Sequence, residues 1–236
     1  MPGMKKSMYS LMLSDGVVAE IDRIAAQNGV SRSALVDGIL ADYASLMTPE
    51  KRIAKIFEQL ESFINGDTSA LLGDKGLDIG EMPDITPCLA PNQLTMSLKS
   101  SLEYKYRPTI RYEVQMYRSP VKNEVGDLSV IYRTQSSELL SAVTNFFRLW
   151  QRLESAYIKH REGHEIIWSA SGGKFTRGLY LRRGYDYTNE QIGTEIGEYI
   201  RMLDTIMKKY LSQGYETARE LENDYVYCLE RGVGRI

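Results

Sequence analysis

The stretch SMYSLMLSDGVVAEIDRIAAQNGVSRSALVDGILADY, residues 7–43, decides how the first part of the chain folds. Residues 8–13 alternate in a way that predicts a short β-strand with two different faces. One face carries Tyr9, Leu11 and Leu13, and the other carries Met8, Ser10 and Met12. A single apolar strand beside two short helices cannot enclose a core, because the strand needs a partner strand. This segment therefore predicts a dimer.

Two short helices are predicted after the strand. The first covers residues 17–27 after a cap at Ser14 or Asp15, and Asn28-Gly29 ends it because both residues tolerate a left-handed backbone. Ser31 is the predicted N-cap of the second helix, whose apolar residues recur at helical spacing. These residues are Leu35, Ile39, Leu40, Tyr43 and Leu46.

This order of elements resembles the ribbon-helix-helix family of bacterial DNA-binding proteins, the Arc, MetJ and CopG group. The matching residues are Lys5-Lys6, the strand, the first helix, the turn Asn28-Gly29-Val30 and the helix start Ser31-Arg32-Ser33-Ala34-Leu35, within the first 46 residues of the chain. The resemblance implies that strands from two copies pair into an antiparallel ribbon that enters the major groove of double-stranded DNA. It also implies a homodimeric transcription regulator such as a repressor, with a plasmid partition or mobilisation adaptor as the alternative.

The resemblance and the strand pattern together assign DNA contacts to particular side chains. A ribbon in the major groove points its outward residues at base edges, which are Lys6, Met8, Ser10 and Met12. The N-terminus of a helix presents N–H groups and a positive dipole end to a phosphate. The predicted phosphate contacts are therefore Lys5, Ser31, Arg32 and Ser33.

The predicted ribbon departs from the family in its outward residues, which often include Arg, Lys, Asn or Gln. Two methionines and a serine make no bidentate base contact, and residues 1–50 hold four basic against six acidic residues. Direct readout is therefore expected to be weak, or sequence preference to come through DNA shape. The competing interpretation is a protein-interaction module whose ribbon only dimerises.

The rest of the chain predicts an α+β fold, with the ribbon-helix-helix segment followed by an antiparallel-sheet domain with long helices. The expected domains are 1–47 for dimerisation and DNA binding, a connecting helix at 48–65, a Gly- and Pro-containing linker at 66–92, and 93–236. In the last domain, alternation predicts a three-strand meander, followed by a long helix with apolar residues from Leu139 to Tyr157. Two strands around Ser171-Gly172-Gly173 come next. Two further helices, the first opened by a Thr188/Gln191 capping box, and a loose tail at 232–236 complete the chain.

Composition narrows the classes of function. The 236 residues carry a net charge of -2 and no run of 18 apolar residues, and the start has no signal-peptide pattern, so a cytoplasmic protein without a membrane partner is expected. Cys88 and Cys228 are too isolated for a disulfide scaffold or a cysteine zinc site. His160 and His164 lack a third ligand nearby, and a surface position is expected for both. We therefore expect no catalytic residues, no metal and no cofactor.

Charge is unevenly distributed in the C-terminal part. Residues 148–183 hold eight basic and three acidic residues, whereas residues 186–224 hold nine acidic and four basic residues. The basic stretch either faces phosphates or pairs with the acidic helices of the same or a partner chain, and the pairing is the favoured interpretation. This domain is expected to serve oligomerisation, a protein partner or an effector.

Overall fold

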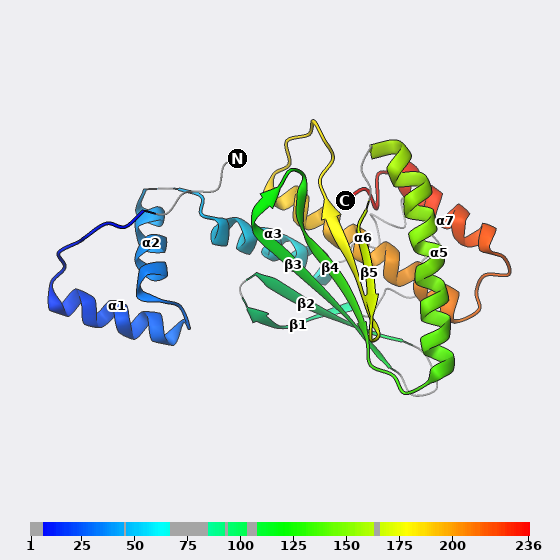
Figure 1. The fold of residues 1–236 in the computed structure, drawn as a ribbon, viewed down its shortest axis with the longest axis horizontal. Helices are drawn as coiled ribbons and strands as arrows, with labels where there is room; N and C mark the ends of the chain where they lie inside the picture. The colour runs from blue at the N-terminus through cyan, green and yellow to red at the C-terminus, as the bar shows by residue number, and fades with distance from the viewer. Residues whose placement is uncertain (1–6, 45, 67–84, 93, 103–107, 163–165) are drawn as a thin grey trace. The chain divides into compact units, whose positions relative to one another are not determined.

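The computed structural model describes residues 7–44, 46–66, 85–92, 94–102, 108–162 and 166–236 (Figure 1). The chain divides into two compact units, Met1–Arg52 and Ile53–Ile236, which we call the smaller and the larger unit.

Two helices make up most of the smaller unit. Helix α1 (Asp15–Gln27) follows Ser14 at its N-cap position, and Gly29 has the positive φ of 63° that the predicted helix stop requires. Helix α2 (Arg32–Tyr43) begins where the Ser31 hydroxyl accepts a hydrogen bond from the Ala34 N–H at 3.2 Å. The predicted ends of both helices are therefore close to the observed ones.

Residues 7–14 have no regular secondary structure in the single chain. A two-stranded ribbon needs a second copy to supply its other strand. The strand expected in this segment, and with it the ribbon-helix-helix arrangement, stays a prediction.

The larger unit is a mixed α and β structure around a six-stranded antiparallel sheet of strand order β1-β2-β3-β4-β6-β5. Its strands are β1 (Ile85–Asn92), β2 (Thr95–Ser101), β3 (Thr109–Val121), β4 (Glu124–Tyr132), β5 (Trp168–Ser171) and β6 (Lys174–Tyr180). Its helices are α3 (Pro49–Asn65), which begins in the smaller unit, α5 (Ser137–Glu162), α6 (Asn189–Leu211) and α7 (Ala218–Glu230). The expected α+β class is confirmed.

Helices α5 and α6 pack on the same face of this sheet (Figure 1). On that face, Tyr112 of β3 pairs across the strands with Val130 of β4, which pairs with Phe175 of β6. The Tyr112 hydroxyl donates a hydrogen bond to Asp204 of α6, and Phe175 stacks on Phe147 of α5 at 4.1 Å between ring centroids. The predicted alternation is therefore confirmed, because the apolar side of the meander faces the helices.

The opposite face of the sheet is polar. Cross-strand pairing places Ser97 beside Glu113, Glu113 beside Ser129, and Ser129 beside Thr176, where the last two hydroxyls lie 3.0 Å apart. Beyond these strands, β5 and β6 form the predicted hairpin at Ser171-Gly172-Gly173, where both glycines have positive φ. That turn is therefore a hairpin connection between two antiparallel strands.

Two expectations about irregular segments are wrong. Residues 85–92 of the predicted linker form the edge strand β1, where Pro87 and Pro91 fit because an edge strand needs fewer ladder hydrogen bonds. Residues 67–84 of that linker lie outside the described residues. The tail at 232–236 is not loose, because Val233 and Ile236 are buried in the core.

The core also reaches back along α3 to Ile53, so the helix expected to connect the domains is an integral part of the larger unit.

Helices α3 and α6 approach closely at two glycines of α6. A Cβ atom on Gly193 would lie 2.5 Å from the carbonyl oxygen of Ile56, and one on Gly197 would lie 2.4 Å from the Phe63 ring. Backbone atoms of α3 therefore occupy the space that a side chain at position 193 would need.

Replacing Gly193 with alanine is expected to reduce the free energy of unfolding of the larger unit by about 1–3 kcal/mol, because the helices must separate. Chemical denaturation followed by tryptophan fluorescence measures this, since both tryptophans, Trp150 and Trp168, lie in the larger unit. The wild-type protein is the reference, and unchanged stability of the Gly193→Ala variant would contradict the close packing.

Candidate nucleic-acid interface

The residues predicted to face DNA bases lie on an exposed segment before α1. Met8 and Met12 are fully exposed and Ser10 is exposed, so each is available to a partner. The fourth residue of this set, Lys6, and the predicted phosphate contact Lys5 lie outside the described residues. The predicted inward residues Tyr9, Leu11 and Leu13 are exposed as well, at 82%, 61% and 44%.

The three predicted phosphate contacts on α2 lie together at its exposed N-terminus. Ser31 caps the helix with its hydroxyl oxygen, and Arg32 and Ser33 are the first two helical residues. The Arg32 guanidinium is already engaged, because its Nε and Nη2 donate to the two carboxylate oxygens of Asp22 on α1 at 2.6 and 2.5 Å. Hydrogen bonding from Arg32 holds the pKa of the Asp22 carboxyl below its ordinary value, so Asp22 is ionised at neutral pH.

The other arginine of this region is paired in the same way. Arg23 donates from Nε and Nη2 to the two carboxylate oxygens of Glu20, one turn earlier on α1, at 3.0 and 2.5 Å. Arg23 and Arg32 are the two basic residues between positions 7 and 50 of the sequence. Each of these positive charges is therefore matched by a carboxylate of α1.

Apolar side chains on the smaller unit are mostly open to solvent. The large apolar residues of this unit that are exposed are Met8, Tyr9, Leu11, Met12, Leu13, Val17, Ile39, Leu40, Tyr43, Leu46 and Met47. By contrast, the buried apolar residues of its described part are Ala25 and Ala41. Large apolar side chains that gather on the surface of a soluble protein often mark a site that a partner covers.

The basic and acidic stretches of the larger unit do not behave as simple surface patches. Arg177, counted in the basic stretch, is 1% exposed and pairs with Glu154 of the same stretch. Lys209 pairs with Asp224, again within the acidic stretch, at 2.8 Å. Arg148 and Arg152 remain on the exposed side of α5. Pairing between the two stretches thus stays a prediction.

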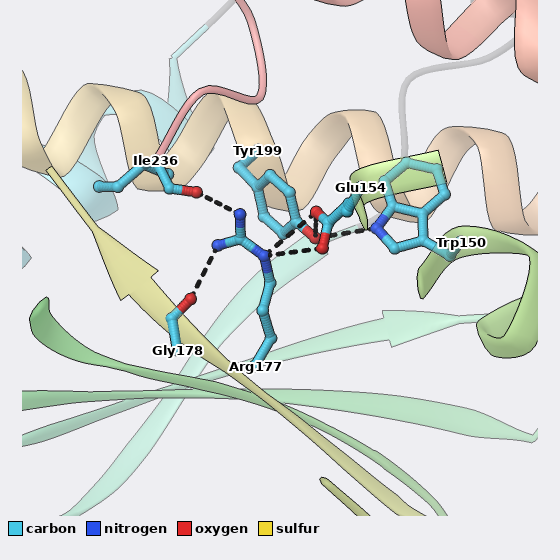
Figure 2. A network of polar contacts seen from close by, with 6 residues as sticks. All are labelled: Trp150, Glu154, Arg177, Gly178, Tyr199 and Ile236. Carbon is cyan, nitrogen blue, oxygen red and sulfur yellow. Dashed lines mark hydrogen bonds and ion pairs between the residues drawn. The ribbon is translucent and has the colours of Figure 1, made fainter. Parts of the chain in front are cut away.

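Arg177 and Glu154 belong to a buried polar network that joins four parts of the larger unit (Figure 2). Nε of Arg177 on β6 donates to both carboxylate oxygens of Glu154 on α5, at 3.1 and 3.2 Å. The Tyr199 hydroxyl on α6 donates to Glu154 at 2.8 Å and accepts a hydrogen bond from Trp150 at 2.9 Å. The two terminal nitrogens of Arg177 donate to the main-chain oxygens of Gly178 and Ile236.

This buried network has a structural role. Burial raises the pKa of the Glu154 carboxyl, although Arg177 and Tyr199 oppose that rise by stabilising the carboxylate. Glu154 is 0% exposed, so it has no surface on which a substrate could bind. The network ties β6, α5, α6 and the final residue of the sequence together, which explains why the tail is ordered.

Sequence reasoning missed this pair, although one signal was readable. Phe175, Arg177 and Leu179 alternate on one face of β6, and the first and last are apolar core residues. An arginine between them must point inward, and a buried arginine requires a carboxylate partner. Which carboxylate it meets depends on the packing of α5, which the pattern does not specify.

The described part of the chain lacks two further features. No group of three or more histidine, cysteine or acidic side chains is placed to hold a metal ion there. His164 and the side chain of His160 lie outside that part. Among the helices that are described, none has the length and apolar character to span a membrane.

Comparisons with known proteins add no assignment. No known protein family, curated protein or solved structure matches this chain significantly.

Proposed function

We propose that the chain is a homodimeric, cytoplasmic DNA-binding protein that regulates transcription, with a ribbon from two copies inserted in the major groove. The observation that carries the proposal is the exposed apolar surface of the smaller unit, from Met8 to Met47. Covering this surface with a second copy would remove it from water and would give each predicted strand a partner. The predicted strand at residues 8–13, followed by the helix, turn and helix at residues 15–43, supports the ribbon-helix-helix arrangement.

In this proposal, the ribbon and α2 have separate tasks. Met8, Ser10 and Met12, with Lys6, face base edges, where methionine packs on thymine methyl groups without a directional bond. Ser31, Arg32 and Ser33, with Lys5, contact phosphates and fix the position of the ribbon. Sequence preference should therefore be modest and should depend on DNA shape as well as on direct contacts.

The larger unit would provide oligomerisation, a binding site for a protein partner, or an effector site. A plasmid partition or mobilisation adaptor is an alternative with the same DNA contact. The second candidate is a protein-interaction module whose ribbon only dimerises. It is favoured by the pairing of Arg23 and Arg32 with carboxylates, which leaves their charges neutralised in the free chain.

Selection of bound duplexes from a random pool by the full-length protein separates these functions. A regulator should enrich a short palindrome with half-sites about one helical turn apart, as expected for a two-fold symmetric protein. A partition adaptor should enrich repeated sites. A module that only dimerises should enrich nothing.

Arg32→Ala is expected to weaken duplex binding by about threefold to tenfold and almost equally for all sequences, because it removes a phosphate contact in each copy. Met12→Ala and Ser10→Ala should change the preferred sequence more than the overall affinity. Titrations of selected and scrambled duplexes in a fluorescence anisotropy assay measure both effects. Unchanged binding in all three variants would refute the assignment of these residues.

A further inference from the structure

The contact between Arg32 and Asp22 has the geometry of arginine bound to an oxyanion. Two nitrogens of one guanidinium meet two oxygens of one carboxylate at 2.6 and 2.5 Å, across the corner between α1 and α2. A planar guanidinium binds a phosphate through the same parallel pair of N–H groups. While Asp22 accepts hydrogen bonds from Nε and Nη2, Arg32 cannot offer these two donors to another anion.

The position of the Arg32–Asp22 contact makes it relevant to DNA binding. Arg32 is the first residue of α2, where the helix dipole and free N–H groups favour a phosphate. Asp22 brings a negative charge to that same point. It therefore opposes a phosphate contact in two ways, by occupying the Nε–Nη2 edge of the guanidinium and by repelling the phosphate.

We propose that Asp22 acts as an internal competitor for Arg32 and thereby limits the affinity of the protein for DNA. This inference rests on the proposed function. Binding then exchanges a carboxylate for a phosphate on the same guanidinium. The residue that sets the strength of the contact is thus an acid of α1 that would touch no part of the DNA.

The exposure of the pair makes such an exchange feasible. The Arg32 and Asp22 side chains are 57% and 45% exposed, so water and ions reach both. Exposed ion pairs contribute little to stability and are weakened by salt. A phosphate approaching along the α2 axis can therefore displace the carboxylate without unfolding either helix.

The chain supplies its own control for charge. Arg23 and Glu20 form an equally bidentate and similarly exposed pair, with 56% and 55% of the two side chains exposed. Both partners of this pair belong to α1, and the hydrogen bonds between them do not involve Arg32. Asp22→Asn and Glu20→Gln each remove one negative charge per copy and nearly preserve side-chain shape, but only the first would free the proposed phosphate contact.

The experiment measures binding of the wild-type, Asp22→Asn and Glu20→Gln full-length proteins to one selected duplex between 50 and 200 mM salt, values typical of such titrations. Asp22→Asn is expected to raise affinity by about threefold to thirtyfold at the lowest salt. It should also steepen the slope of log affinity against log salt by up to about one unit per copy. Glu20→Gln should change affinity by less than about twofold. Circular dichroism melting of all three proteins verifies that each is folded.

Three results would overturn the inference. Equal gains in the two variants would mean a general charge effect, and no gain in Asp22→Asn would mean that Asp22 does not compete. Lower affinity in a folded Asp22→Asn protein would mean that Asp22 positions Arg32 for DNA instead. Absence of duplex binding by the wild-type protein would refute the proposed function itself, and is thus distinguishable from all three.

Discussion

Arg177→Met is expected to lower the free energy of unfolding of the larger unit by about 3–5 kcal/mol. Removing one member of a buried ion pair leaves the other charge without compensation in a low-dielectric interior. Here Glu154, at 0% exposure, would keep the hydrogen bond from Tyr199 but would lose its ion-pair partner. The main-chain oxygen of Ile236 would lose its donor in the same change, so the tail should detach. Urea denaturation followed by tryptophan fluorescence, together with limited proteolysis of the C-terminus, measures both effects.

The double variant Glu154→Leu with Arg177→Met separates loss of the pair from loss of packing. Replacing both charges with apolar groups of similar volume is often neutral, so the double variant should regain most of the lost stability. A single variant that loses less than about 1 kcal/mol would contradict the role assigned to the network. A double variant as unstable as the single one would show that Arg177 acts mainly through Gly178 and Ile236.

Leu11→Asp is expected to abolish dimer formation at micromolar concentration, and with it DNA binding. Leu11 is the central residue of the apolar face of the predicted ribbon, and each dimer would bury two added carboxylates there. An unpaired buried charge costs several kcal/mol, so the dissociation constant of the dimer should rise by at least about 100-fold. Sedimentation velocity measures the dimer, and anisotropy measures the duplex binding.

Ser10→Asp is the matched control for Leu11→Asp, because it adds the same charge to the adjacent residue on the outward face. It should leave the dimer intact and still prevent binding, since a carboxylate in the groove repels the phosphates. A Leu11→Asp protein that remains dimeric and binds duplex DNA as tightly as the wild-type protein would show that the apolar face of the predicted strand is not the interface. A Ser10→Asp protein that still binds DNA would show that this face does not enter the groove.

Sequence patterns predicted the regular elements of the larger unit well, because each depends on local spacing. Alternation gave the buried face of β3, with Tyr112 and Val114 both at 0% exposure. The capping box was also correct, since Thr188 accepts from the Gln191 N–H and its own N–H donates to the Gln191 side chain. Such signals involve residues three or four positions apart and need no knowledge of the rest of the fold.

Features that depend on distant contacts were not predictable in the same way. Strand β1 contains prolines and little alternation, and it forms because it can pair with β2 along the sheet edge. The buried tail depends on Arg177, which is 59 residues from Ile236 along the chain. The contact of Arg32 with Asp22 depends on the angle between α1 and α2, which no spacing rule specifies.

The position of the candidate site could be predicted from the sequence, but the ion pairing of its residues could be predicted only in part. The pattern placed Ser31, Arg32 and Ser33 at a helix N-terminus, and the structure has them there. The sequence alone counted Arg32 as a positive charge for DNA, whereas in the single chain a carboxylate neutralises it. The acidic residues within positions 1–50 are therefore expected to weaken DNA binding in two ways. They lower the net charge of this segment, and Asp22 pairs directly with Arg32.

The most direct test of the central claim is the salt dependence of duplex binding by the full-length protein. The four positively charged phosphate contacts per dimer, from Lys5 and Arg32 of each copy, predict a slope of log affinity against log salt of about -3 to -4 before any loss to the Asp22 pair. The proposed function predicts a slope of about -2 or steeper, together with enrichment of a palindromic site. A protein that is dimeric but binds no duplex at low salt, or binds with a slope near zero, would contradict it.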